Sequence, residues 1–255
     1  MRIIISPAKK MNMDTDTFPI SGLPELLSET KKLMKYIKKQ DFNRLKQIWK
    51  CNDALVSLNQ ERFTHMDLET NLTPAILSYE GLQYQYMAPK VMEETALEYL
   101  QEHLRILSGF YGVLKPFDGV TPYRLEMQAR LGGEEMDSLY AFWKDRLAKS
   151  IYLEDPLILN LASKEYSKAV VPYLPKDATV VTVVFGEEKQ GKIIEKGTMA
   201  KMARGEMVRF LAEMKGDTLE AVCSFDRLGY HFCESLSEEN KLIFLKDPIK
   251  NGEEY

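Results

Sequence analysis

The chain opens with a short, strongly apolar segment, Ile3 to Ile5, which is followed by polar residues. A β-branched run of this length is typical of a buried strand. The run PLILNLAS at 156–163 has the same character and predicts a second buried strand. Apolar residues also alternate on both sides of the segment GEEKQG, over 178–185 and 192–195, and this pattern predicts a β-hairpin.

Helices are predicted wherever apolar residues recur at near-helical spacing. A polar loop over 12–22 precedes three expected helices. The first begins at Pro24, the second is capped by Asp41, and the third covers 53–63. The same spacing predicts further helices over 89–108, 139–152, 165–171 and 199–214.

Two segments carry a less regular pattern. The spacing of apolar residues over 75–87 does not distinguish a helix from a strand, and a short helix followed by an extended segment is one interpretation. Late strands are expected within 219–245, where EAVCSF would pair with HFCESL or LIFL. Strands and helices are thus interspersed without strict alternation, which predicts an α/β fold with a mixed sheet, packed helices and an early helical insertion. Because no linker, low-complexity tract or repeat is present, we expect 1–255 to form one domain, or two closely packed lobes.

The composition is that of an ordinary globular protein, with 45% hydrophobic and 28% charged residues among 255. No segment approaches the ~18 unbroken apolar residues of a membrane span. The isoleucine run is also shorter than the ~7 residues of a signal-peptide core, so a cytoplasmic location is expected. The three cysteines, sparse and odd in number, fit reduced thiols.

The net charge is −4, but positive charge gathers in two stretches far apart in sequence. Residues 1–10 contain Arg2, Lys9 and Lys10 and no acid, and residues 196–209 contain four cations, including Lys201 and Arg204, against one glutamate. If the fold brings the two stretches together they form a cationic site. Separate solvated faces are the commoner outcome for such runs.

A glycine-bearing turn at 109–112 follows the helix predicted over 89–108. Gly109 and Gly112 permit unusual backbone conformations, and exposed amides in such a turn can hold a phosphate oxygen. Lys115 and Arg124 would supply the countercharge. The alternative is an ordinary packed turn whose aromatic residues belong to the core.

Lys9 has the strongest case for a special role, because it follows a buried strand at the position where open sheets place ligand groups. Its compact charge suits phosphate, and Lys9 is also a candidate catalytic residue. The alternative is an exposed loop lysine that only aids solubility. Glu126 is a candidate general acid or base beside Arg124, although an ion pair of purely structural role is the commoner arrangement. Other polar or aromatic candidates at strand ends or nearby are Ser6, Asn160, Ser163 and Tyr123.

No cofactor or metal site is predicted. The phosphate-binding signatures GxxxxGK[ST] and GxGxxG are absent from the sequence, as is the GxSxG elbow. His231 and Cys233 would share one face of a strand, with Cys223 across a hairpin, and three such groups could hold zinc. Cysteines in such positions are more often plain core residues.

Several stretches together resemble the YaaA family of bacterial peroxide-stress proteins. They are ISPAK at 5–9, RILSGFYGVLKPFD at 105–118, PYRLEM at 122–127, NLASKEYSK at 160–168, KMARGEMVRF at 201–210 and GYHF at 229–232. The resemblance implies a role in limiting free iron and oxidative damage during peroxide stress. It also implies an unusual α/β fold that binds DNA through a cationic cleft, with a helix-hairpin-helix-like element that we match to 109–112.

The sequence therefore predicts two candidate functions. The first is a sequence-tolerant DNA-binding protein of the peroxide-stress response, with a DNA or phosphate site made of Ser6, Lys9, Lys10, Gly109, Gly112, Lys115, Tyr123, Arg124, Asn160, Ser163, Lys201 and Arg204. The second is an enzyme acting on a nucleotide, a base or another phosphorylated small molecule in the same cleft. A closed pocket with Lys9 and Glu126 in hydrogen-bond reach would favour the second. Direct iron sequestration ranks last, because dense His and carboxylate ligands are lacking.

Overall fold

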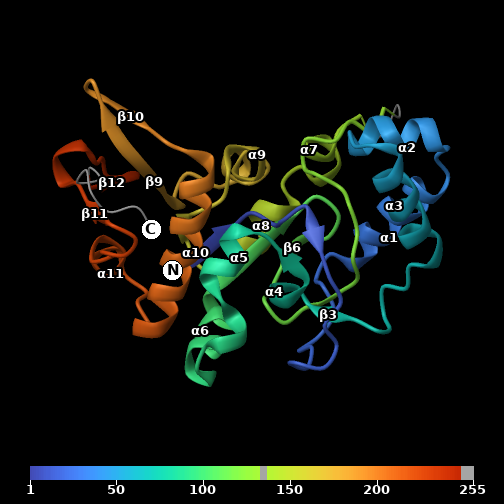
Figure 1. Ribbon diagram of the computed structural model, residues 1–255, viewed down its shortest axis with the longest axis horizontal. Helices are drawn as coiled ribbons and strands as arrows, with labels where there is room; N and C mark the ends of the chain where they lie inside the picture. The colour runs from blue at the N-terminus through green and yellow to red at the C-terminus, as the bar shows by residue number, and fades with distance from the viewer. Residues whose placement is uncertain (133–136, 248–255) are drawn as a thin grey trace.

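The computed structural model describes residues 1–132 and 137–247 and contains a mixed sheet of eight strands (Figure 1). The strand order is β11-β12-β9-β8-β1-β5-β6, and β10 pairs with β9 outside this path. The strands are β1 (Arg2–Ile5), β5 (Leu104–Ser108), β6 (Gly112–Leu114), β8 (Leu157–Asn160), β9 (Thr179–Lys189), β10 (Lys192–Ile194), β11 (Tyr230–Phe232) and β12 (Lys241–Lys246). Two small ladders pair β2 (Lys10–Met11) with β4 (Tyr79–Glu80) and β3 (Thr73–Pro74) with β7 (Gly119–Val120).

Helices surround this sheet, and three of them form the early insertion at one end of the molecule (Figure 1). The insertion consists of α1 (Leu27–Lys38), α2 (Phe42–Trp49) and α3 (Asp53–His65). The other helices are α4 (Ala75–Ser78), α5 (Leu82–Met87), α6 (Glu94–His103), α7 (Leu139–Trp143), α8 (Arg146–Tyr152), α9 (Lys164–Ser167), α10 (Gly197–Met214) and α11 (Leu219–Cys223), with 3-10 turns η1 (Pro89–Val91), η2 (Val171–Tyr173) and η3 (Glu234–Leu236). The predicted mixed α/β fold is confirmed. Within the described ranges, no helix is long and apolar enough to cross a bilayer.

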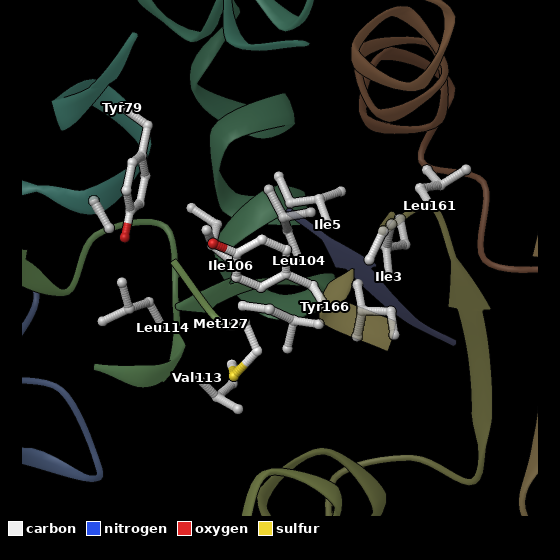
Figure 2. Packing of buried hydrophobic residues seen from close by; sticks show 14 of the residues in the cluster. Ile3, Ile5, Tyr79, Leu104, Ile106, Val113, Leu114, Met127, Leu161 and Tyr166 are labelled. Carbon is white, nitrogen blue, oxygen red and sulfur yellow. The ribbon is translucent and has the colours of Figure 1, made fainter. Parts of the chain in front are cut away.

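The five central strands are parallel, and β1 lies between β5 and β8. Ile3, Ile4 and Ile5 are fully buried, which is why this strand reads as an unbroken apolar run. Ile3 and Ile5 lie in the same core as Leu104 and Ile106 of β5 (Figure 2). From β1 the chain goes first to β5 on one side and later to β8 on the other, so the strand order reverses at β1. Ligands of open α/β sheets bind at such a reversal, beyond the carboxyl ends of the strands.

Three predicted elements differ from the structure. The helix expected over 89–108 ends at His103, and Leu104–Ser108 forms β5 because all five of these residues are buried between β1 and β6. The helix expected over 139–152 is broken at Lys144, whose φ of 47° is left-handed, into α7 and α8. The segment EAVC is helix α11, capped by Thr218, and β11 pairs with β12 instead.

The turn at 109–112 consequently joins two strands, and the helix-hairpin-helix-like element expected there is instead a β-hairpin between β5 and β6. Long apolar runs do not distinguish a helix from a buried strand by periodicity alone. Because residues 104–108 are apolar and directly follow α6, the helical spacing continues into the strand, and the sequence pattern predicts a helix that is too long.

Asp118 is a buried carboxyl that fixes the chain after β6. Its Oδ2 accepts a hydrogen bond from the backbone N–H of Lys115 at 2.8 Å, and its carbonyl accepts one from Ala75 at 2.9 Å. Burial raises the pKa of Asp118 from 3.8 to about 6. The folded protein therefore holds this proton to higher pH than the unfolded chain does.

We expect the free energy of unfolding to fall as pH rises from about 4 to about 6, because ionising Asp118 is harder in the folded state. The shift corresponds to roughly 3 kcal/mol at this one site. Asp118→Asn keeps an acceptor for Lys115 and removes the titration, so urea denaturation across this range should show a flatter profile than wild type. The exposed Asp16→Asn variant is the control, and profiles of equal slope for wild type and Asp118→Asn would contradict the expectation.

Candidate functional site

A pocket of about 400 Å³ lies beyond the carboxyl ends of β1 and β8, where the strand order reverses. Its walls come from the connection after β1, the start of α5, the segment 123–126, the start of α9 and the first half of α10. These segments are far apart in sequence, so the pocket exists only in the folded protein.

Two serines hold the strand exits together at the base of this pocket. The Oγ atom of Ser6 accepts a hydrogen bond from the backbone N–H of Ser163 at 2.9 Å and lies 3.2 Å from its hydroxyl. The hydroxyl of Tyr84, in α5, donates to the carbonyl of Ser6 at 3.0 Å. The exits of β1 and β8 and helix α5 are therefore fixed relative to one another.

Glu126 is the centre of the charged part of the pocket. Its Oε2 lies 2.8 Å from Lys9 Nζ, and its Oε1 lies 3.0 Å from Nη2 of Arg124. One carboxylate thus joins two cations. Lys9 reaches this contact from the loop after β1 and remains largely exposed, whereas the Glu126 side chain is mostly buried.

The remaining cations of the lining differ in their partners. Lys10 pairs with Glu80, and Arg204 Nη2 lies 3.2 Å from Glu195 Oε2. Burial lowers the pKa of Arg204, although its ion pair with Glu195 opposes that shift. Lys201 is exposed at the same wall and makes no ion pair in the part of the chain that the structure describes.

A second carboxyl, Glu165, lines the pocket at the start of α9. Its Oε1 accepts a hydrogen bond from the backbone N–H of Gln128 at 3.2 Å. Burial raises the pKa of Glu165, and the negative charge of Glu126 adds to the shift. The pocket therefore contains two carboxyls in different settings, Glu126 between two cations and Glu165 with a pKa raised by burial. Such a difference suits groups that donate and accept protons.

Tyr123 forms a rigid aromatic wall. Its hydroxyl lies 2.6 Å from Ser108 Oγ and 2.8 Å from the hydroxyl of Tyr79, and all three groups are buried. Ser108 Oγ also accepts the backbone N–H of Tyr111 at 2.8 Å. Burial raises the pKa of Tyr123 to about 12, so this phenol stays neutral at pH 7.

The structure brings most of the predicted site residues together. The pocket lining contains Glu126 and eight of the predicted DNA- or phosphate-binding residues, namely Ser6, Lys9, Lys10, Tyr123, Arg124, Ser163, Lys201 and Arg204. Two cations of each basic stretch therefore line one pocket, Lys9 and Lys10 from 1–10 and Lys201 and Arg204 from 196–209, whereas Arg2, Lys196 and Arg209 lie elsewhere.

Four predicted residues lie elsewhere. Lys115 follows β6, which runs antiparallel to β5, so it lies at the opposite edge of the sheet, 3.2 Å from Glu154. Asn160 is buried and bonds to Thr182 and Ala162. Gly109 and Gly112 are buried in the hairpin, and a Cβ on Gly109 would lie 2.4 Å from the carbonyl oxygen of Leu125.

Sequence reasoning missed several residues of the lining, above all Gln83 and Glu165. Gln83 lies on α5, is buried, and its Nε2 makes no hydrogen bond within 1–132 and 137–247. An unsatisfied buried amide costs about 1–3 kcal/mol. No motif announces Gln83, since the period of 75–87 is ambiguous. Glu165 was detectable from its place just after a predicted strand.

The residues considered for zinc do not assemble. Cys223 lies on α11, and His231 Nδ1 lies 3.2 Å from Asp247. Among residues 1–132 and 137–247, no group of three or more His, Cys, Asp or Glu side chains has the arrangement of a metal site.

The fold and the pocket define an α/β protein with a charged pocket at the carboxyl edge of a mixed sheet. Comparison with known proteins then gives the family. The sequence model of the family described as "Peroxide stress protein YaaA" matches residues 1–236. A relative from Lachnoclostridium phytofermentans, described as "UPF0246 protein", is 56% identical over 246 residues, 96% of each chain. A Pediococcus pentosaceus relative with the same description is 49% identical over 249 residues, 98% of this chain and 99% of its own. This chain therefore belongs to the peroxide stress protein YaaA family, as its motifs predicted.

Helices α5 and α10 approach closely at Gly205, where they form one wall of the pocket. A Cβ at Gly205 would lie 2.0 Å from the carbonyl oxygen of Gln83. Any side chain at position 205 would therefore require the backbone of α5 or α10 to move. It places Gln83 of α5 beside Arg204 of α10.

We expect Gly205→Ala to separate α5 from α10 and lower the free energy of unfolding by roughly 1–3 kcal/mol. Gly197→Ala, at the start of the same helix, is the matched control because nothing lies within 4 Å of the added Cβ. The control should be neutral or stabilised by up to about 1 kcal/mol. Urea denaturation of both variants measures the difference, and equal stabilities would contradict the close contact.

Proposed function

We propose that the pocket binds a small phosphorylated molecule, such as a nucleotide, and that the protein acts on it as part of the peroxide-stress response. The observation that carries the proposal is the contact of 2.8 Å between Lys9 and Glu126 inside a cavity of about 400 Å³. This volume is in the range of small-molecule sites. A surface for duplex DNA needs cations but rarely a carboxylate at its centre.

The charge of the pocket supports a single phosphate group. Five cationic and three acidic side chains line it, and Glu195 neutralises Arg204 from outside the lining. The excess is about one positive charge with every carboxyl ionised, and a phosphate monoester carries about −1.5 to −2 at pH 7. A long polyanion would meet four of the five cations in ion pairs already, and only Lys201 outside one among the described residues.

The two carboxyls suit proton transfer to or from the bound molecule. Glu126 is held by Lys9 and Arg124, and burial raises the pKa of Glu165 above its usual value. In the proposed roles, Glu126 accepts a proton or a hydrogen bond and Glu165 donates one. Tyr123 and Tyr166 supply flat walls that suit a ring.

Isothermal titration with AMP and adenosine tests the proposal. We expect AMP to bind and adenosine to bind at least about tenfold more weakly, since a charged hydrogen bond contributes that much. Lys9→Gln should weaken AMP binding by roughly tenfold, whereas Glu126→Gln should strengthen it because Lys9 and Arg124 are released.

Opposite effects from the two partners of one ion pair distinguish a binding role from a structural one. Lys31→Gln is the control, because Lys31 pairs with Glu69 on the surface of α1. No binding of AMP or inorganic phosphate by wild type, or equal losses in both Lys9 and Glu126 variants, would refute the proposal.

The second candidate function is binding of DNA, through which the protein would help to limit iron-dependent oxidative damage. It is favoured by the exposed lysines at the mouth of the pocket, since the side chains of Lys9 and Lys10 are 66% and 79% exposed and Lys201 is exposed as well. The ammonium groups of these lysines can contact the phosphate backbone of DNA without the DNA entering the pocket.

If DNA is the partner, the logarithm of the binding constant should fall linearly with the logarithm of salt concentration. Lys201→Gln should reduce that slope by about 1, because one phosphate contact is lost. Lys31→Gln should leave the slope unchanged. Fluorescence anisotropy with a labelled duplex measures both, and a slope unaffected by Lys201→Gln and by Lys10→Gln would exclude this surface.

A further inference from the structure

A second cavity, of about 820 Å³, opens at the opposite edge of the sheet, where the parallel strands begin. Arg2 begins β1, Arg105 lies near the start of β5, and Glu154 precedes β8. Lys115 arrives at the same edge because β6 is antiparallel. This is the place of the one predicted cation that the first pocket does not include.

The floor of this cavity gathers three cations around one carboxylate. Glu154 lies 3.3 Å from Arg2 Nε, 2.6 Å from Arg105 Nε and 3.2 Å from Lys115 Nζ. Burial alone would raise the pKa of Glu154, but Arg105 and Lys115 lower it below its usual value. Asp118, which does not line the cavity and also lies near Glu25, faces Lys115 and Arg105, so one positive charge is in excess among the three cations, Glu154 and Asp118.

Part of the hydrogen-bonding capacity of the two arginines is not used by the protein. Arg105 forms its hydrogen bonds through Nε and Nη1, and its Nη2 donates to none of the described residues and is not fully buried, so it is accessible to solvent or to a ligand. Arg2 Nε is buried, and its contact with Glu154 lacks hydrogen-bond geometry. An excess of one charge with spare N–H donors matches a carboxylate better than a doubly charged phosphate.

An apolar wall stands beside the charged floor. Phe18 and Phe117 pack edge to face with ring centroids 6.0 Å apart, and both are only partly buried. Leu97 and Met92 line the same cavity. Aromatic and aliphatic surface that faces a cavity in this way suits an apolar group of a ligand.

The third feature is an acidic rim. Glu94, Glu98 and Glu102 lie one turn apart along the same side of α6, and all three are exposed and line the cavity. Carboxylates at this mouth repel simple anions and attract an ammonium group. The cavity therefore presents cations at its floor, apolar side chains at its wall and acids at its rim.

We propose that the amino-edge cavity is a second ligand site, which binds a small zwitterion with an apolar body, the chemistry of an apolar amino acid. Its carboxylate lies on Arg105 and Lys115, its side chain lies against Phe18 and Phe117, and its ammonium group faces the α6 acids. The inference does not depend on the proposed function of the carboxyl-edge pocket, because the two cavities share no lining residue.

Three probes that differ by one group each test the assignment in the full chain. They are 3-phenylpropionate, 3-phenylpropionamide and L-phenylalanine, titrated calorimetrically at millimolar concentration. We expect the acid to bind roughly tenfold more tightly than the amide, and phenylalanine more tightly than the acid. Lys115→Gln should lower the affinity for the acid by roughly tenfold and leave the amide unchanged.

Glu98→Gln should weaken phenylalanine and leave 3-phenylpropionate unchanged or improved, since only phenylalanine has an ammonium group. Both substitutions alter partly or fully exposed side chains, and thermal melting checks that the variants stay folded. Lys31→Gln is the charge-matched control. Equal binding of acid and amide, insensitivity to Lys115→Gln, or no binding of any probe would overturn the second site, and each outcome is independent of the result with AMP.

Discussion

The parallel pairing of β1 on both of its sides is the constraint on which the rest of the structure depends. Ile3, Ile4 and Ile5 are fully buried because β5 and β8 flank them and helices cover the sheet. The strand order reverses at β1, so the loop after Ile5 leaves the sheet where no crossover fills the edge. The proline and lysines of this loop then line a pocket instead of a core. The position of β1 between β5 and β8 therefore explains both the burial of the strand and the exposure of the loop that follows it.

Internal ion pairing decides what kind of anion suits the pocket. The basic stretches do converge, yet Lys9, Lys10, Arg124 and Arg204 all meet glutamates. Charges that neutralise one another at short range leave a weak field at distance, and salt screens that field further. A ligand of the kind we propose would therefore have to enter and exchange partners with these pairs. This requirement favours a small molecule over a long polymer.

The sequence predicted those parts of the fold in which one local pattern dominates. The strands β1, β8 and β9 and the helix α10 follow from clear apolar runs or helical spacing. Leu104–Ser108 was misassigned to a helix because its apolar residues continue the period of α6, and only pairing with β1 reveals the strand. Likewise, Lys144 has no local signal that predicts its left-handed conformation.

The candidate site was predictable as far as residue type and strand ends allow. Lys9, Arg124 and Glu126 are near one another or at a strand end in the sequence, so their grouping could be expected. Gln83 could not be found, because its place in the pocket depends on the contact of α5 with α10 at Gly205. Lys115 was assigned to the wrong edge, since the direction of β6 follows from a hairpin that the sequence did not reveal.

The shortness of β1 has a mechanical consequence. A strand of four residues spans about 13 Å, and hydrogen bonds to neighbours on both sides prevent it from stretching. Arg2, which lines the second cavity, and Ser6, which lines the first, are thus held at a fixed separation by β1. If β1 shifted along its axis, these two residues would move together, in the same direction and by the same amount.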